Sequence, residues 1–441
     1  MSPRRARAAD RPLRRVVVLL ALTATTSILL ADCSTSRTAA AAAAASSPSS
    51  RVAAALGASP TDPGATSPRS PSARPSGPAP RSTGTPQPYA FTGAGSLATE
   101  ARRARPLVYV PEQLAGTVQV IDPRTYAVIA TRRVPRSPEH VVPSADLRRL
   151  WVNSDAGNAL TPIDPRTGAV GTPVPVRDPY NLYFTPDGRS ALVMAERLRR
   201  VDVRDARTMA LRRSLPVPCA GLNHADVTAD LTRMLVSCEF SGDLVELDAA
   251  ATRVVRVIDL NDIRTPGATR PADARSMGGP AAMLASGATS MPQDVRLSPD
   301  GRSFLVADML RNGIWVIDAT TFRETRFVRT GLGAHGIYPA RDARRVFVSN
   351  RGEGSVSVLD GATLRPLVTW RIPGGGSPDM GGVTADGREL WFSGRYDSCV
   401  YVIDTVTGRV THHIRVRPGP HGLLVWPQPG RFSLGHTGNM R

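Results

Sequence analysis

An apolar segment that ends in Asp recurs along most of this chain, and no other feature constrains the fold as strongly. The residues that mark it are Asp122, Asp164, Asp205, Asp248, Asp318, Asp360 and Asp404. Successive positions differ by 42, 41, 43, 70, 42 and 44 residues. A period near 42 residues with about four short strands per unit is typical of a propeller blade. We therefore expect an all-β chain that folds as a seven-bladed β-propeller.

A second series of turn residues repeats with the same spacing. Its members are Asp146, Asp187, Asp230, Asp300, Asp342 and Asp386, which differ by 41, 43, 70, 42 and 44 residues. The long step exceeds the usual one by about 28 residues, which is too few for another four-stranded blade. The sequence therefore predicts an insertion at residues 261–288, between the fourth and fifth blades.

The two ends of the repeat region complement each other. The first unit begins at residues 107–110, which read as a second strand without an inner neighbour, and the missing inner strand reads at residues 421–425. We expect the first blade to be closed by this C-terminal inner strand, so that the propeller spans residues 105–441. Residues 431–439 also read as a strand, which either lies over the first blade or competes with residues 107–110.

The repeat itself resembles a known family. Residues 346–350 (VFVSN), followed by the segment 352–360, are similar to the YVTN-type, or YncE-like, propeller repeat, and residues 150–153 and 107–110 are similar to its first part. The resemblance extends over about residues 105–426. It implies the fold but no activity, because propellers include binding proteins, lactonases, dehydrogenases and cofactor enzymes.

The N-terminus reads as an export signal. Six Arg residues precede an uncharged apolar run at residues 16–31, which is shorter than the roughly 20 residues that span a bilayer. Cys33 follows this run in a context that resembles a lipoprotein box. Residues 1–33 are therefore a lipoprotein signal with lipid on Cys33, a cleaved signal of a secreted protein, or an uncleaved anchor. Each alternative predicts an extracytoplasmic protein that contacts the membrane only through its N-terminus.

Residues 34–104 are expected to be a disordered linker, because this Ala-, Pro- and Ser-rich segment has few large apolar side chains to bury. The net charge of +18 comes from 55 basic residues, all of them Arg, that are spread along the chain. Nucleic-acid binding is therefore not expected, since that function gathers basic residues on one face. The expected partner is a protein, a cell-wall polymer or a small molecule, bound by a monomer.

Strand order predicts where a functional site lies. The loops that enter the inner strands and the loops between second and third strands emerge on one face, around the mouth of the central channel. Polar residues concentrate at these positions. At the inner strands we predict ligand-binding roles for His140, Asn181, His224, Asp294, His335, Met380 and His421. After the second strands we predict the same for Glu196, Glu239, Asp308, Asn350, Arg351 and Arg395, beside Asp155.

Four of these residues are His, and with neighbouring carboxylates they could hold a metal ion. However, His335 and His421 stand one position earlier than His140 and His224, so the four need not converge. No phosphate-binding loop, haem-attachment motif or nucleophile motif is found. The preferred hypothesis is a ligand- or partner-binding module that acts through the channel mouth. The alternative is an enzyme at the same mouth, lactonase-like or metal-dependent.

Two further Cys residues fit an exported protein. Cys219 precedes the inner strand of the fourth blade, and Cys238 ends the second strand of that blade. Both positions fall at the same rim, and disulfides persist in oxidising compartments outside the cytoplasm. We therefore predict a disulfide between Cys219 and Cys238.

Overall fold

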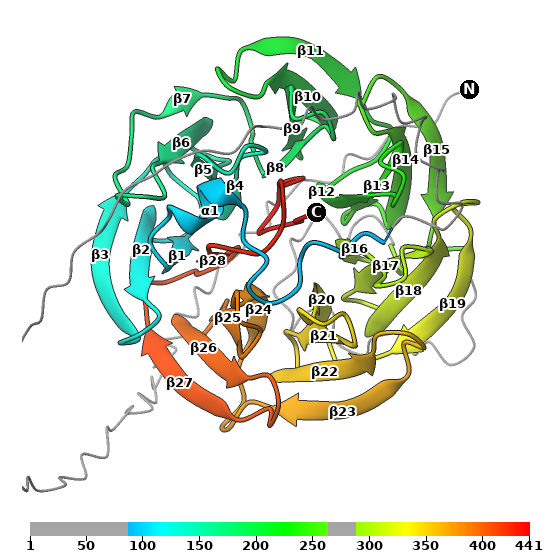
Figure 1. The fold of residues 1–441 in the computed structure, drawn as a ribbon. Helices are drawn as coiled ribbons and strands as arrows, with labels where there is room; N and C mark the ends of the chain where they lie inside the picture. Colours follow the sequence, from blue (N-terminus) through cyan, green and yellow to red (C-terminus); the bar gives the residue numbers. More distant parts are fainter. Residues whose placement is uncertain (1–86, 263–287) are drawn as a thin grey trace, which may run out of the picture. The chain divides into compact units, whose positions relative to one another are not determined.

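The computed structural model describes residues 87–262 and 288–441. The predicted export signal with Cys33, most of the linker and nearly all of the insertion lie outside the described residues. Within the described ranges, the strands form seven four-stranded antiparallel sheets around a central axis (Figure 1). The prediction of a seven-bladed β-propeller is confirmed.

Each blade is an antiparallel meander of four strands, of which the first lies nearest the axis and the last at the rim. From the inside outward, the first four blades consist of β28 (Leu424–Trp426), β1 (Leu107–Glu112), β2 (Thr117–Asp122) and β3 (Ala127–Arg133); β4 (Pro138–Pro143), β5 (Leu150–Ser154), β6 (Ala159–Ile163) and β7 (Val174–Pro175); β8 (Asn181–Phe184), β9 (Ser190–Ala195), β10 (Arg200–Asp205) and β11 (Leu211–Pro216); and β12 (Leu222–Val227), β13 (Arg233–Cys238), β14 (Asp243–Asp248) and β15 (Val254–Asp259). The last three consist of β16 (Pro292–Leu297), β17 (Ser303–Asp308), β18 (Gly313–Asp318) and β19 (Glu324–Arg329); β20 (Ala334–Pro339), β21 (Arg345–Asn350), β22 (Ser355–Asp360) and β23 (Pro366–Arg371); and β24 (Pro378–Val383), β25 (Glu389–Gly394), β26 (Cys399–Asp404) and β27 (Val410–Arg415).

The ring closes through its first blade, as predicted. Strand β28 near the C-terminus pairs antiparallel with β1, with Leu107 opposite Trp426 and Tyr109 opposite Leu424. In Figure 1 the two strands lie side by side at the junction between the first and last blades. The C-terminal strand therefore fastens the two ends of the repeat region together.

The recurring Asp residues have a local cause. At the end of β18, Asp318 Oδ1 accepts hydrogen bonds from the backbone N–H groups of Thr320 and Thr321. In the other series, Asp187 Oδ1 accepts hydrogen bonds from the Thr185 hydroxyl and the Arg189 N–H. A short carboxylate that bonds to backbone two or three residues ahead stabilises a tight turn. Both series thus mark strand reversals.

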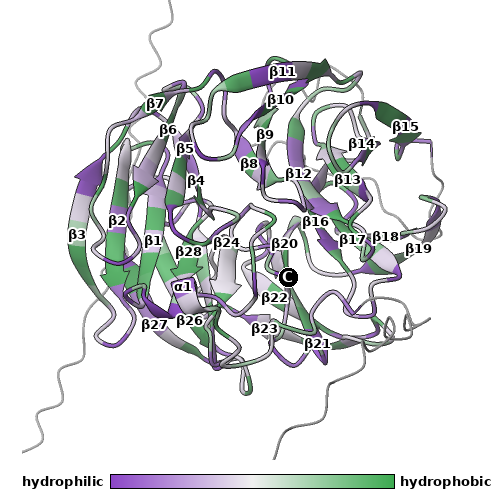
Figure 2. Ribbon diagram, turned by 45° about the horizontal axis from the view of Figure 1, so that its top comes forward, coloured by the Kyte–Doolittle hydropathy of each residue, from purple (hydrophilic) through white to green (hydrophobic). Residues whose placement is uncertain are grey.

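The core lies between neighbouring blades. One cluster joins Leu235 and Leu244 of the fourth blade to Val295, Phe304 and Trp315 of the fifth, all of them fully buried. The outermost strands alternate exposed and half-buried residues instead, and Figure 2 shows hydrophilic stretches on β3 and β11. Because each sheet buries both faces against its neighbours, no single blade is expected to be stable alone.

Residues before position 105, the boundary predicted from the sequence, also contact the propeller. The Tyr89 hydroxyl donates a hydrogen bond to the Leu297 carbonyl, and Gly95 N–H donates one to the Ala385 carbonyl. The short helix α1 (Thr99–Arg102) follows, with Ala101 buried beside β1. No helix within residues 87–262 and 288–441 is long and apolar enough to span a membrane.

The C-terminal tail, residues 427–441, takes neither place that the sequence analysis offered for it. It folds back on itself, with Ser433 opposite Met440, and its tip lies against the inner strands of the third and fourth blades. His436 N–H donates a hydrogen bond to the Leu182 carbonyl, and the Arg441 guanidinium binds Asp226 at 2.6 Å. The tail therefore fills the channel from the face opposite the predicted site.

Candidate functional site

The predicted face carries a hollow of about 410 Å³ at the channel mouth. We call it the mouth hollow. Its wall is formed by residues from all seven blades and the connections between them. The polar side chains among them are Gln113, Glu139, Asp155, Tyr180, Glu196, Glu239, Gln293, His335, Arg351, Arg395, Tyr396 and His421. Of the predicted residues, Asp155, Glu196, Glu239, His335, Arg351, Arg395 and His421 are in this wall.

Below the hollow, the inner strands supply a second layer of side chains. Most inner strands change register near their start; between β12 and β13, for example, Leu222 is opposite Cys238 but Ala225 is opposite Val236. Such a bulge can turn two consecutive residues toward the axis. Asn223 therefore bonds Glu239 of the mouth hollow at 2.7 Å, while the adjacent His224 bonds Asn181 at 3.0 Å in the deeper layer.

Five imidazoles meet around the axis, so the four predicted His residues do converge. The ring centroids of His140 and His421 are 4.8 Å apart, and those of His224 and His335 are 6.4 Å apart. The fifth ring is His436 of the tail, 4.5 Å from His224. Gly422 permits this packing, because a Cβ atom at that position would lie 2.2 Å from the His140 ring.

Burial keeps these imidazoles neutral. It lowers the pKa of His140 to about 3 and that of His335 to about 4. It likewise lowers the pKa of His224, His421 and His436 well below the ordinary value. Neutral imidazole is the form that binds metal ions, so the protonation state of the cluster suits metal binding.

One group of metal-binding character borders the mouth hollow. Potential ligand atoms of His335, Asp379 and His421 lie within 4.8 Å of one another. His335 Nδ1 is 3.0 Å from Asp379 Oδ1, and the Arg351 guanidinium is also 3.0 Å from that oxygen. Burial alone would raise the pKa of Asp379, but the neighbouring His335, Arg351 and His421 hold it well below its usual range. Because the imidazoles are neutral, Arg351 provides the charge that stabilises this carboxylate.

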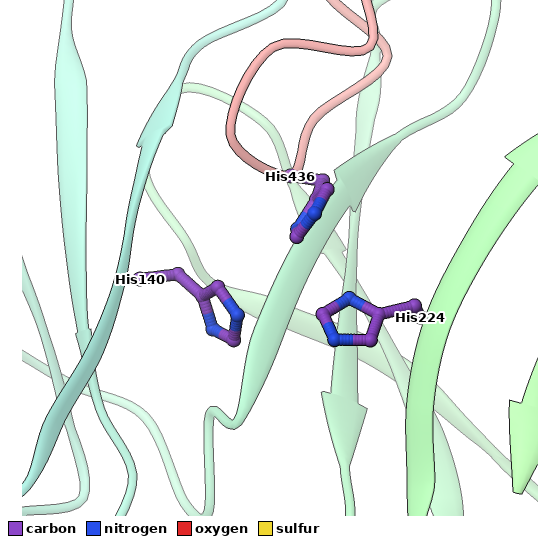
Figure 3. A group of neighbouring side chains, drawn as sticks. All are labelled: His140, His224 and His436. Atoms are coloured by element: carbon purple, nitrogen blue, oxygen red, sulfur yellow. The ribbon is translucent and has the colours of Figure 1, made fainter. Parts of the chain in front are cut away.

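The other group lies deeper, in the second layer. It consists of His140, His224 and His436, whose potential ligand atoms also lie within 4.8 Å of one another. Figure 3 shows the three rings pointing toward a common centre, two from inner strands and one from the tail. This group is fully buried.

Two carboxyl groups of the mouth hollow, those of Glu239 and Glu196, have raised pKa values. Burial raises the pKa of Glu239 to about 7. Burial, together with the nearby Glu239 and Glu139, raises the pKa of Glu196 well above its ordinary value. Glu196 of the third blade and Glu239 of the fourth therefore face the hollow from one side, and Arg351 of the sixth blade and Arg395 of the seventh face it from the other.

Some predicted ligand-binding residues have other roles. Asp308 holds a loop, because its carboxylate accepts hydrogen bonds from Met291 N–H and the Trp315 indole. Asn350 also holds a loop, because its side chain accepts a hydrogen bond from Gly331 N–H and donates to the hydroxyl groups of Ser355 and Ser357. Neither Asp308 nor Asn350 lines the mouth hollow. Met380 lies beneath it, with its sulfur 3.2 Å from His335 Nδ1. Asn181 and Asp294 likewise belong to the deeper layer.

Sequence reasoning missed Glu139, Tyr180 and Asp379, which stand immediately before His140, Asn181 and Met380. Their signal was present, since each is a polar or aromatic residue at an inner-strand entry, but only one residue per strand was considered. His436 had no such signal, because it lies beyond the repeats. The predicted pair, Cys219 and Cys238, forms a disulfide with a Cα–Cα distance of 6.0 Å.

Comparisons with known proteins agree with this architecture. The model of the family described as YncE-like β-propeller matches residues 85–214 and 277–429. None of the curated proteins compared with this chain matches it. Among solved structures, hydrazine synthase of Kuenenia stuttgartiensis is similar, with 17% identity, a TM-score of 0.55, and coverage of 74% of this chain and 97% of that one.

Two further structures have the same fold. A functionally unknown protein from Desulfotomaculum acetoxidans has 14% identity and a TM-score of 0.57, and the match covers 74% of this chain and all of that one. The dihydro-heme d1 dehydrogenase NirN has 16% identity and a TM-score of 0.53, over 79% of this chain and 83% of its own. At these identities the likeness concerns the fold alone. The family match covers most of the chain, and this protein belongs to the YncE-like β-propeller family.

Proposed function

We propose that this protein is an exported binding module that takes up a small polar molecule in the mouth hollow. The ligand carries a cationic group, which the acidic side of the hollow receives, and an anionic group, which Arg351 and Arg395 receive. The observation that carries the proposal is the arrangement of ionisable groups across one hollow, with the carboxyl groups of Glu196 and Glu239 on one side and the two guanidinium groups on the other. Although burial raises the pKa of both carboxyl groups, a bound cation favours their ionised form.

Unsatisfied polar atoms support a ligand at this place. Glu196 Oε1 and Arg395 Nη1, both in the wall of the mouth hollow, are buried and have no hydrogen-bond partner among the described residues. Buried polar atoms without partners are rare in folded proteins and call for an explanation. A bound molecule with donors and acceptors would supply the missing hydrogen bonds.

The size of the mouth hollow also favours a small molecule. Its volume of about 410 Å³ is in the range of ligand pockets, roughly 300–1,000 Å³. A cell-wall polymer would need an open groove, and a protein partner would need a broad surface of about 800 Å² per side. Export is supported by the N-terminal sequence pattern and by the disulfide between Cys219 and Cys238.

A metal-dependent enzyme is the second candidate, favoured by the group of His335, Asp379 and His421 at the hollow. It ranks second because Arg351 is 3.0 Å and Arg395 is 3.9 Å from Asp379. Two guanidinium charges this close oppose the approach of a metal cation.

The test is a thermal-shift screen of the full chain with small amines, carboxylates and zwitterions, followed by calorimetry on the best binder. We expect zwitterions to raise the melting temperature more than molecules with one charge of either sign. Glu196→Gln and Arg395→Gln should each weaken binding about 10-fold or more, since the bound cation favours the ionised form of Glu196 and each substitution therefore removes one charged contact.

Glu100→Gln and Arg148→Gln are the matched controls. This ion pair, with a distance of 3.5 Å, lies on the opposite face of the propeller, beside the turn between β4 and β5. Both controls should bind like the wild type. Equal loss of binding in the controls, or a preference for singly charged molecules, would contradict the proposal.

A further inference from the structure

Three buried nitrogen atoms in the deeper layer have no hydrogen-bond partner within the described part of the chain. They are the Nε2 atoms of His140, His224 and His436. The rings are fully buried and converge on one point (Figure 3). Three imidazole nitrogens without hydrogen bonds, gathered in one place, are the donor set of a metal that prefers nitrogen ligands.

We propose that His140, His224 and His436 bind one divalent first-row transition metal, of the Zn²⁺ or Cu²⁺ type, through their Nε2 atoms. This ion fastens the C-terminal tail inside the channel. The site is separate from the mouth hollow, so the inference does not depend on the proposed ligand.

Distances between the ligand atoms are compatible with this role. Ligand atoms around a tetrahedral zinc ion, at about 2.0–2.1 Å from the metal, lie about 3.4 Å from each other. Each of the three His residues offers one ring nitrogen that lies within 4.8 Å of a ring nitrogen of the other two. Small rotations of the side chains bring them to bonding distance without movement of the strands.

A fourth ligand is available on the fifth blade. Asp294 Oδ1 is 3.6 Å from His436 Nε2 and has no hydrogen-bond partner. Asp294 Oδ2 is already held by Ile337 N–H at 2.9 Å and by Arg296 at 3.3 Å, which fixes the carboxylate in place. Four protein ligands in a buried site make a closed coordination sphere, as in structural rather than catalytic metal sites.

The other ring nitrogens explain how the ligands are oriented. A ligating His usually donates its second N–H to a carbonyl or carboxylate. His140 Nδ1 is 3.0 Å from the Tyr180 carbonyl, so His140 already has this arrangement. His224 Nδ1 and His436 Nδ1 both face the Asn181 side-chain amide, at 3.0 and 3.1 Å.

The Asn181 amide can present either its nitrogen or its oxygen to these two rings. A half-turn about its terminal torsion directs the oxygen toward both Nδ1–H groups and leaves both Nε2 atoms free for the metal. This turn gives up the hydrogen bond from Leu182 N–H to Asn181 Oδ1 and reverses the direction of the two hydrogen bonds between the amide and the imidazoles. Asn181 is thus a positioning residue for the site.

Metal uptake by the full chain, produced without a polyhistidine tag and freed of metal by a chelator, tests the proposal. We expect one equivalent of Zn²⁺ per chain by equilibrium dialysis, and visible absorption of tetrahedral type when Co²⁺ is the probe. Metal should raise the melting temperature of the wild type, because it binds only the folded state. His436→Gln and His224→Gln should weaken binding about 100-fold or more.

Further variants separate this site from its alternatives. His413→Gln, an exposed residue on β27, should leave uptake unchanged. Asn181→Asp should tighten binding, because a carboxylate accepts both Nδ1–H groups, and Asn181→Leu should weaken it by about 10- to 100-fold. These two variants decide the question even if a His substitution prevents folding.

The proposal fails if wild-type protein takes up no stoichiometric metal, or if folded His436→Gln binds as well as the wild type. It also fails if uptake is lost in His421→Gln but retained in His436→Gln. That result would assign the metal to the group at the mouth hollow instead.

Discussion

His436 Nε2 lies 3.6 Å from Asp294 Oδ1, and the two residues come from the C-terminal tail and the fifth blade. This contact joins a segment outside the repeats to the side of the ring opposite the closing strand β28. The tail is also bound to the third blade through Leu182 and to the fourth through Asp226. It therefore links the third and fifth blades, which are not neighbours in the ring.

The tail is expected to contribute to stability through Leu434. This side chain is fully buried among residues of the third and fourth blades, including Tyr183. Leu434→Ala should lower the free energy of unfolding by about 2–5 kcal/mol, as for other buried Leu residues. Leu367→Ala, whose side chain is 56% exposed, should change it by less than about 0.5 kcal/mol. Urea unfolding measures both, and equal effects would mean that the tail packs only loosely.

The sequence predicted the blades well and the axis less well, for a physical reason. Asp318 and Asp187 stabilise turns by local hydrogen bonds, so they recur with the period of the fold and can be read directly. The bulges of the inner strands break simple alternation, and Glu139 and Asp379 were missed for that reason. His436 reaches the axis by a fold-back that no repeat encodes.

The disulfide should stabilise the fourth blade. Cys219 and Cys238 are 19 residues apart in sequence. In the loop-entropy model, a disulfide that closes a loop of this length stabilises the folded protein by about 3 kcal/mol, because it restricts the unfolded chain. Replacing both residues with Ala should reduce the free energy of unfolding by about this amount. Reduction of the wild type with dithiothreitol should have a similar effect. With Cys33 and Cys399 replaced by Ala, titration of two reactive thiols in exported, unreduced protein would contradict the bond.

Export can be tested at Cys33. If the N-terminus is a lipoprotein signal, metabolic labelling with a palmitate analogue should mark the wild type and not Cys33→Ala. The label should accompany retention of the protein in the membrane fraction. Complete release of unlabelled wild type into the medium would instead favour a cleaved signal, and unlabelled retention would favour an uncleaved anchor.

The buried imidazoles should make the protein sensitive to acid. His140 has a pKa of about 3 in the folded protein, against an ordinary value of 6.5. Protons therefore bind the unfolded chain first as the pH falls below 6.5, and stability is lost down to about pH 3. Between these two pH values, this group lowers the free energy of unfolding by about 1.4 kcal/mol for each unit by which the pH falls. Unfolding titrations at pH 4 to 7 should show a shallower decline for His140→Gln, and parallel curves would contradict this assignment.

Ligand binding should depend on pH through Glu239. Its pKa is raised to about 7, so the carboxyl group is largely neutral in mildly acidic solution and ionised above pH 7. A cationic group gains its attraction only from the ionised form. The affinity for an amine or zwitterion should therefore rise up to 10-fold per pH unit below about pH 7 and level off above it.

Glu239→Gln separates this effect from other titrations at the mouth hollow. The amide keeps the size of the side chain and can still bond Asn223, which lies 2.7 Å from the carboxylate in the wild type. It carries no charge at any pH, so its affinity for the cation should be lower and nearly constant between pH 5.5 and 8. Calorimetry of both proteins across this range measures the difference. An unchanged pH profile in Glu239→Gln would assign the dependence to Glu196 instead, because that carboxyl group is also buried beside the hollow and has a raised pKa.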